Sequence, residues 1–190
     1  MIGLMFAVAT LLGDPSVFGI KLGAPSPLPE CIHAMIISER SPDLYDFVQP
    51  KTCREKANRI PDEQFERGWM HFPTKIMPDV VTFPMVSTIE IDGNVEQVEF
   101  NTFGHDLMSD VIAQLSTKYG APTGSRPSLS IIEGIGVPMT DTLWVFANMA
   151  VEYRSIGPSM EAGVVTVTTS KGFRALMAGI DRRNAAKTPL

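Results

Sequence analysis

The sequence has few charged residues and little concentrated positive charge. Only 19% of its 190 residues are charged, and the formal net charge is −5 at pH 7. Lysines and arginines that bind nucleic-acid phosphates gather on one face of a protein, whereas those of this chain are scattered. Arg182 and Arg183, with Lys187, fall where a last helical turn is expected, and cations there complement the helix dipole. We therefore expect no nucleic-acid partner.

The chain also lacks an apolar run long enough to cross a bilayer as a helix, which takes about 20 residues. Residues 1–13, MIGLMFAVATLLG, form an apolar run with the length of a signal-peptide hydrophobic region, although no positively charged segment precedes it. We interpret this run as a leader remnant. A buried first strand or helix of the mature domain is the alternative. No integral membrane span is predicted.

Sequence motifs of enzymes are missing as well. The chain has no Gly-x-Ser-x-Gly, Ser-x-x-Lys or His-Glu-x-x-His pattern, and EGIGVP at 133–138 lacks the third glycine and the lysine of a phosphate loop. His105 and Asp106 are adjacent, so they do not face each other on a helix. We predict no catalytic residues and no cofactor.

Cysteine is scarce, and its only two copies are Cys31 and Cys53. The segment between them is polar and contains Pro42 and Pro50, so it has little core of its own. A cross-link closing a loop of this size stabilises by roughly 3 kcal/mol. A disulfide needs an oxidising compartment, which agrees with a leader. We predict a Cys31–Cys53 disulfide and a periplasmic or secreted location, with a cytoplasmic location as the alternative.

The same region allows a different chemistry. Cys31, His33, Cys53 and His71 are four residues of the types that hold tetrahedral zinc. No cysteine pair has the usual short spacing, so we expect no metal. This zinc set and two free thiols remain the alternatives to the disulfide, and the region would then suit a small hydrolase or a thiol/zinc enzyme.

The first part of the chain after the apolar run is rich in proline, which keeps regular elements short. We predict an irregular arm over 14–84, pinned by the disulfide. Within it, SVFGIKLG at 16–23 predicts a short strand, and DEQFERGW at 62–69 predicts one or two helical turns. An α+β core follows at 85–183, and residues 184–190 are expected to fray.

The core begins with a hairpin and a helix. MVSTIEI and VEQVEF flank Asp92-Gly93, a strong hairpin signal, and the phase of Val95 indicates a bulge. An apolar stripe at helical spacing follows and stops at Gly120. The residues of this stripe are Leu107, Val111, Ile112, Leu115 and Tyr119. Four of them, Leu107 to Leu115, are expected to pack on the strand residues Ile89, Ile91, Val98, Phe100, Val165 and Val167.

Three further strands, at 143–147, 149–155 and 164–169, precede a second amphipathic helix capped by Ser170. VEFNT before the first helix echoes VTVTT before the second, which indicates a ββα pseudo-repeat. We predict an antiparallel sheet with two helices on one face. The expected apolar stripe of the second helix consists of Phe173, Leu176, Met177 and Ile180.

Residues 124–140 connect these halves and are too apolar to be left in water without a reason. The segment either adds an edge strand at SLSII or presents an apolar patch to a partner. The candidate binding residues are Arg126, Leu129, Ile131, Ile132, Glu133, Ile135 and Met139.

Several of these stretches carry a resemblance. FGIKLGAPSPLPEC, DGNVEQVEF, LSTKYGAPT and GVVTVTT resemble small exported bacterial proteins of α+β type. More loosely, the chain is similar to envelope domains in which a helix ending Lys-Tyr-Gly-x-Pro packs against a sheet. The outer-membrane assembly lipoprotein and β-lactamase-inhibitor-like folds have this shape. The resemblance implies an exported protein and no catalytic residues.

We therefore expect a non-catalytic exported protein that binds another protein or an envelope component. The alternatives are the small hydrolase or thiol/zinc enzyme described above and a cytosolic regulatory protein.

Overall fold

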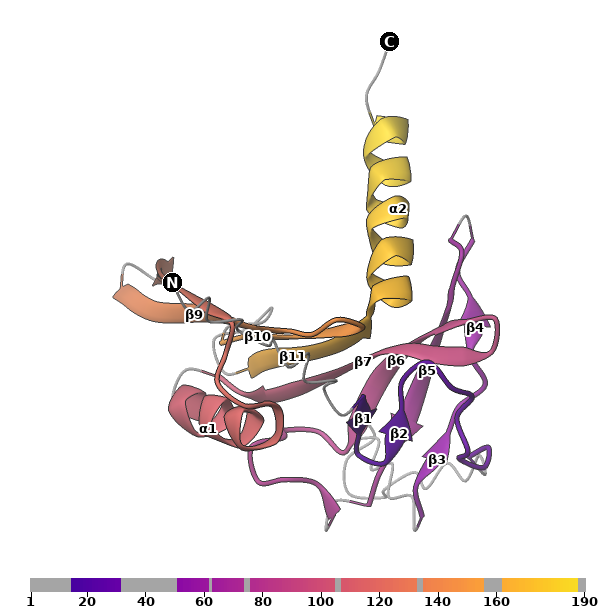
Figure 1. The fold of residues 1–190 in the computed structure, drawn as a ribbon, viewed down its shortest axis with the longest axis horizontal. Helices are drawn as coiled ribbons and strands as arrows, with labels where there is room; N and C mark the ends of the chain where they lie inside the picture. The colour runs from indigo at the N-terminus through magenta and orange to yellow at the C-terminus, as the bar shows by residue number, and fades with distance from the viewer. Residues whose placement is uncertain are drawn as a thin grey trace, which may run out of the picture.

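The computed structural model describes residues 15–31, 51–61, 63–73, 76–104, 107–132, 135–155 and 162–187. The described residues form an α+β fold with one large antiparallel sheet and two helices (Figure 1). The fold class is therefore as predicted. The expected leader at 1–13, the candidate ligand His33 and the candidate contact residue Glu133 lie outside the described residues.

The sheet consists of two meanders that meet in its middle. The first half contains β3 (Cys53–Arg54), β5 (Glu66–His71), β6 (Met85–Ile91) and β7 (Asn94–Phe103). The second half contains β8 (Gly124–Ile132), β9 (Ile135–Val145), β10 (Met149–Arg154) and β11 (Ala162–Thr169). Across the sheet the order is β3-β5-β6-β7-β11-β10-β9-β8, and β4 (Asn58–Arg59) also pairs with β5. A separate hairpin contains β1 (Ser16–Val17) and β2 (Ile20–Lys21).

The β6–β7 hairpin has the predicted turn. Asp92 and Gly93 both have positive φ, at 53° and 74°, as a two-residue type I′ turn requires. The register shifts between Ile89 and Glu90, so the bulge expected from the phase of Val95 is confirmed.

Helix α1 (Met108–Tyr119) lies against one face of the sheet. Val111, Ile112 and Leu115 pack in the same core as Val98, Phe100, Val165 and Val167. The helix ends at Gly120, whose φ is 80°, and the Trp144 indole N–H donates to the Gly120 carbonyl oxygen at 2.9 Å. The predicted contacts of Val111, Ile112 and Leu115 with this core are confirmed, whereas Leu107 is not part of it and Ile89 and Ile91 belong to a separate cluster.

Helix α2 (Ser170–Lys187) stands on the opposite face (Figure 1). Its residues Ala175 and Leu176 pack against Phe65, Ile89 and Ile91. Because Thr88 pairs with Val98, Ile89 and Val98 point to opposite faces of the sheet. The expectation that both helices lie on one face is therefore wrong.

The reason lies in how each helix is connected. A connection after β7 lets α1 turn under the sheet, whereas α2 follows β11 without a loop.

Thr169 caps α2, since the Gly172 N–H donates to its hydroxyl oxygen at 3.0 Å, so the predicted cap at Ser170 is one residue late. If the predicted ββα pseudo-repeat held in space, a two-fold axis perpendicular to the sheet would relate the antiparallel strands β7 and β11. Such an axis would place both helices on the same face. The helices lie on opposite faces, so the two halves are not equivalent in space.

Two further expectations differ from the structure. The segment expected to be irregular contributes β3, β4 and β5 to the sheet, and β5 replaces the predicted helical turns. Period-two burial of Gly68 and Met70 explains why the strand forms. At the other end, α2 continues through 184–187, and Phe173, Met177 and Ile180 are exposed, so only Leu176 of the expected stripe is packed.

No helix in the described part of the chain is both long and apolar enough to span a membrane.

Candidate functional site

An apolar pocket of about 240 Å³ lies between α1 and the sheet. The β1–β2 hairpin and the segment at 78–81 complete its wall. Val111 and Leu115 line it from α1, Phe100 from β7, and Val165 and Val167 from β11. The further lining residues are Val17, Phe18, Pro78, Val80, Val81, Thr102, Gln114, Lys118 and Tyr119.

Phe18 holds the β1–β2 hairpin over this pocket. Its φ is 51°, an uncommon value for a residue with a large side chain. The centroid of its ring lies 4.9 Å from that of Phe100 and 5.5 Å from that of Phe72. These aromatic contacts stabilise the fold and offset the cost of the positive φ. The Lys118 ammonium donates to the Ser16 carbonyl oxygen, which ties α1 to the same hairpin.

The mainly apolar wall contains the buried polar side chain of Thr102. Thr102 is fully buried, with 0% exposure, and its hydroxyl oxygen has no hydrogen-bond partner among the described residues. The phenol oxygen of Tyr153, also 0% exposed, has no such partner in that part of the chain either. Burial raises the pKa of Tyr153 to about 12, and the nearby Thr102 hydroxyl partly opposes the rise. Tyr153 is therefore a neutral phenol near pH 7.

The described lining of the pocket is mainly apolar. Its polar side chains are Thr102, Gln114, Lys118 and Tyr119, and no histidine, carboxylate or cysteine is found among the described residues that line it. A hydroxyl without an adjacent base is a weak nucleophile. The arrangement can exclude water from an apolar molecule and offer it one buried hydroxyl.

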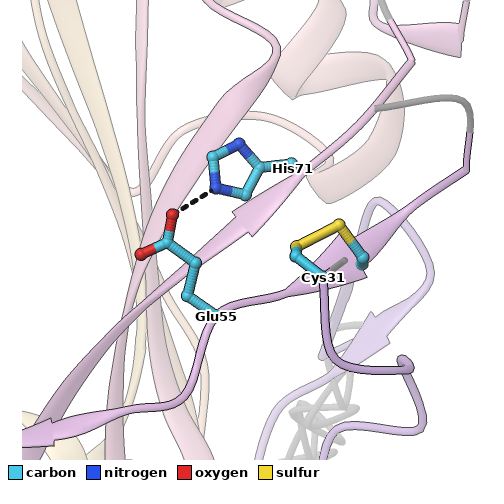
Figure 2. Close-up of a disulfide and its surroundings, with 4 residues drawn as sticks. Cys31, Glu55 and His71 are labelled. Atoms are coloured by element: carbon cyan, nitrogen blue, oxygen red, sulfur yellow. Dashed lines mark hydrogen bonds and ion pairs between the residues drawn. A yellow bond between two sulfur atoms is a disulfide. The ribbon is translucent and has the colours of Figure 1, made fainter. Parts of the chain in front are cut away.

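The cysteine pair lies at the edge strand β3. Cys31 and Cys53 form a disulfide with sulfurs 2.10 Å and Cα atoms 4.9 Å apart, so the predicted disulfide is confirmed. His71 pairs with Cys53 across the strands, and its Nε2 lies 2.7 Å from a carboxylate oxygen of Glu55 (Figure 2). Because the disulfide uses both sulfurs, the alternative zinc set of Cys31, His33, Cys53 and His71 is wrong.

No group of three or more histidine, cysteine, aspartate or glutamate side chains is placed to hold a metal ion among the residues that the structure describes.

The predicted binding segment at 124–140 folds as the β8–β9 hairpin at the sheet edge. Ile132 pairs with Ile135, and Ile131 pairs with Gly136. Leu129 is 65% exposed, whereas Met139 is half-buried. The edge-strand interpretation of this segment is therefore the observed one. Of its candidate residues whose side chains the structure describes, Arg126, Leu129 and Met139, none lines the pocket beneath α1.

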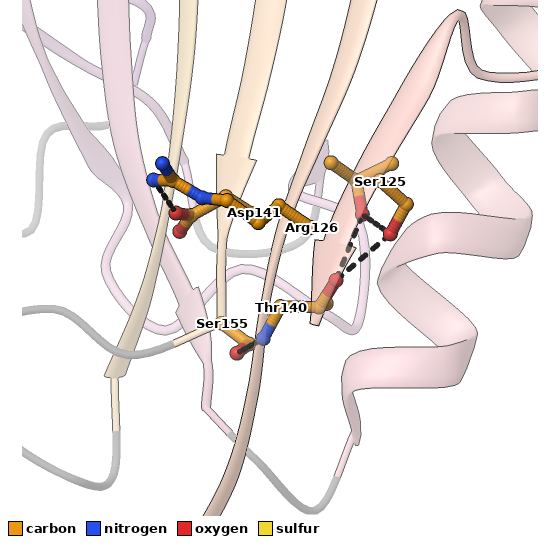
Figure 3. A network of polar contacts seen from close by, with 6 residues as sticks. Ser125, Arg126, Thr140, Asp141 and Ser155 are labelled. Carbon is orange, nitrogen blue, oxygen red and sulfur yellow. Dashed lines mark hydrogen bonds and ion pairs between the residues drawn. The ribbon is translucent and has the colours of Figure 1, made fainter. Parts of the chain in front are cut away.

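Polar contacts join the two strands of this hairpin, and one of them reaches Ser155, the residue after β10 (Figure 3). The Arg126 guanidinium donates to the Asp141 carboxylate at 2.6 Å on the exposed side. The Ser125 and Thr140 hydroxyl oxygens are 2.9 Å apart, and the Thr140 N–H donates to the Ser155 hydroxyl oxygen at 2.8 Å. Every group in this network has a partner, which gives the network a structural role.

The sequence contained one signal for the pocket that sequence reasoning missed. Thr102 follows Val98 and Phe100 at period two, so it occupies an inward position on β7. A hydroxyl at a core position needs a partner. Phe18 carried no such signal, because its role depends on a hairpin packing against distant strands.

No family model, curated protein or solved structure matches this chain. Its function must be argued from the geometry described above.

Proposed function

We propose that the protein is a non-catalytic exported bacterial protein that binds a small apolar component of the cell envelope in the pocket beneath α1. The observation that carries this proposal is the pocket itself, an apolar space of about 240 Å³. An engineered apolar cavity of roughly 150 Å³ stays dry and binds benzene. A larger space of the same character suits a molecule or chain end somewhat larger than benzene.

The compartment in this proposal is supported by the disulfide. Such bonds persist in oxidising compartments, including the periplasm and the extracellular space. The Cys31–Cys53 bond joins the segment before β3 to the sheet edge. Export therefore remains our proposal, and the ligand is sought among envelope components.

Titration with isopropylbenzene tests the pocket. We expect saturable shifts of the methyl resonances of Val111, Leu115, Val165 and Val167 in two-dimensional NMR spectra. Leu115→Trp should fill the space and abolish these shifts. Leu129→Trp, at an exposed position outside the pocket, is the matched control and should bind as the wild type does. Undiminished binding to the Leu115→Trp variant would contradict the proposal.

A second candidate function is binding of a protein partner at the β8–β9 hairpin. It is favoured by the exposure of Leu129 on an edge strand, since such strands offer unpaired backbone groups. A partner from envelope extract should cross-link to the wild type and lose that cross-link in Leu129→Ser. Phe173→Ser, at an exposed position on α2, should retain it. Equal cross-linking of both variants would contradict this function.

A further inference from the structure

We propose that the pocket beneath α1 selects neutral, mainly apolar molecules that carry one carbonyl oxygen, which accepts a hydrogen bond from the Thr102 hydroxyl. This inference rests on the proposed function, because it names the chemical class of the ligand for the same pocket. Its basis is the buried Thr102 hydroxyl in a mainly apolar wall.

The Thr102 hydroxyl is a donor in need of an acceptor. The residue lines the pocket, is fully buried and has no hydrogen-bond partner for its oxygen in the described part of the chain. A buried hydroxyl without a partner destabilises a protein by the cost of removing it from water. A ligand that supplies the missing partner gains this energy, whereas a hydrocarbon of the same shape does not.

The neighbour of Thr102 determines which partner fits. Tyr153 lies beside it, and its phenol is protonated near neutral pH, as an ordinary tyrosine is. Burial raises the pKa of Tyr153 further, to about 12. A phenol can donate to the Thr102 oxygen, and the Thr102 proton is then left for an acceptor. The ligand atom should therefore be an acceptor such as a carbonyl oxygen.

Gly163 makes room for this hydroxyl pair. It lies directly across from Thr102 in the sheet. A Cβ at this position would lie 2.6 Å from the Thr102 hydroxyl oxygen and 3.0 Å from the Tyr153 ring atom Cε2. A glycine in a strand interior weakens the strand, so its presence here has a local packing reason. The position keeps the two hydroxyl side chains in place beside the pocket.

The size and lining of the pocket restrict the rest of the ligand. By comparison with the benzene cavity, the space holds about ten non-hydrogen atoms. It is smaller than the pockets of drug-sized ligands. Lys118 also lines the pocket, but its ammonium donates to the Ser16 carbonyl oxygen. A charged group at Thr102 would therefore lack the charged partner that a buried charge needs. A short aryl or alkyl ketone or the carbonyl end of an ester meets these requirements.

Acetophenone and isopropylbenzene are a matched pair of probes. They have nearly the same shape, and only acetophenone carries a carbonyl oxygen. We expect both to bind the full-length wild-type protein in NMR titrations. Thr102→Val, which keeps the shape and removes the hydroxyl, should weaken acetophenone binding about tenfold, the loss expected for one buried hydrogen bond. Binding of isopropylbenzene should not weaken.

Each other outcome contradicts a specific claim. Equal effects of Thr102→Val on the two probes would overturn the hydrogen bond to Thr102 and leave the apolar pocket intact. Failure of both probes to bind the wild type would overturn the proposed function and this inference with it. Thermal unfolding of Thr102→Val without ligand provides an independent readout. Because Thr102→Val also removes the acceptor of the Tyr153 phenol, the comparison is made in a Tyr153→Phe background, where Thr102→Val should not lower the stability. A clear loss of stability in that background would mean that the Thr102 proton already has an acceptor.

Discussion

At the scale of single residues, Gly163 leaves the space that the side chains of Thr102 and Tyr153 occupy. Gly163→Ala should destabilise the protein by about 1–3 kcal/mol, because the new methyl group would collide with Thr102 and Tyr153 and lie 3.2 Å from the Arg154 carbonyl oxygen. Chemical denaturation measures this change. Gly124→Ala is the matched control, since no atom lies within 4 Å of its added Cβ. Equal midpoints for the two variants would contradict the crowding.

Tyr153 gives a second prediction at this scale. Burial raises its pKa to about 12 from an ordinary value of 10.0. Because the folded pKa exceeds the unfolded one, the stabilisation is complete below about pH 10 and is lost as the pH rises toward about 12. The loss should reach about 2–3 kcal/mol. Urea denaturation from pH 8 to 12 should show this loss in the wild type and a smaller one in Tyr153→Phe. Parallel profiles would contradict the shift.

At the scale of secondary-structure elements, α2 is held by charges near both of its ends. Lys171 near its start lies 2.8 Å from the Asp92 carboxylate. Glu63, whose side chain is 6% exposed, pairs with Arg182 at 3.1 Å and also with Arg183. Arg182 and Arg183 of the basic cluster that the sequence places in a last helical turn therefore bind a buried carboxylate.

Removal of both arginines should leave the buried Glu63 carboxylate without its cations. We expect Arg182→Ala with Arg183→Ala to destabilise the protein by about 1–3 kcal/mol, less than for a fully buried pair because the two arginine side chains are 41% and 54% exposed. Hydrogen exchange should also quicken along α2. Arg174→Ala, at an exposed position on the same helix, should change neither quantity. Unchanged exchange in the double variant would show that α2 is held by its apolar contacts alone.

The elements that could be predicted from the sequence are those specified by nearby residues. Asp92-Gly93 specifies its hairpin through the turn conformation, and Gly120 specifies the end of α1. The placement of α2 could not be predicted, because the face that a helix covers depends on its connection and on distant residues such as Phe65. The pocket was missed for the same reason, since its walls come from residues between Val17 and Val167.

At the scale of the whole molecule, the disulfide joins the N-terminal segment to a sheet edge. The Cys31 N–H also donates to the Arg54 carbonyl oxygen at 2.9 Å, and the Arg54 N–H donates to the Pro29 carbonyl oxygen at 2.9 Å. The bond therefore covers the β3 edge with backbone from the preceding segment. A covered edge cannot pair with another chain.

Loss of this bond should destabilise the protein by roughly 3 kcal/mol, because the bond closes a loop with a sequence separation of 22. Urea denaturation with and without reductant measures the change. Cys31→Ser with Cys53→Ser should match the reduced wild type and should not respond to reductant. A thiol titration in denaturant should find no thiol before reduction and two after it. Two thiols before reduction would contradict both the bond and our case for export.

The meeting of the two meanders at β7 and β11 has a kinetic consequence. Val98 pairs with Val167, so the strands at the centre of the sheet are far apart in sequence, and such contacts form slowly. The pocket has walls from both strands, and it is therefore incomplete until the halves have joined. During synthesis, a chain that has not yet reached β11 has no complete pocket. Ligand binding would then report the completion of folding, and a ligand would stabilise only the finished molecule.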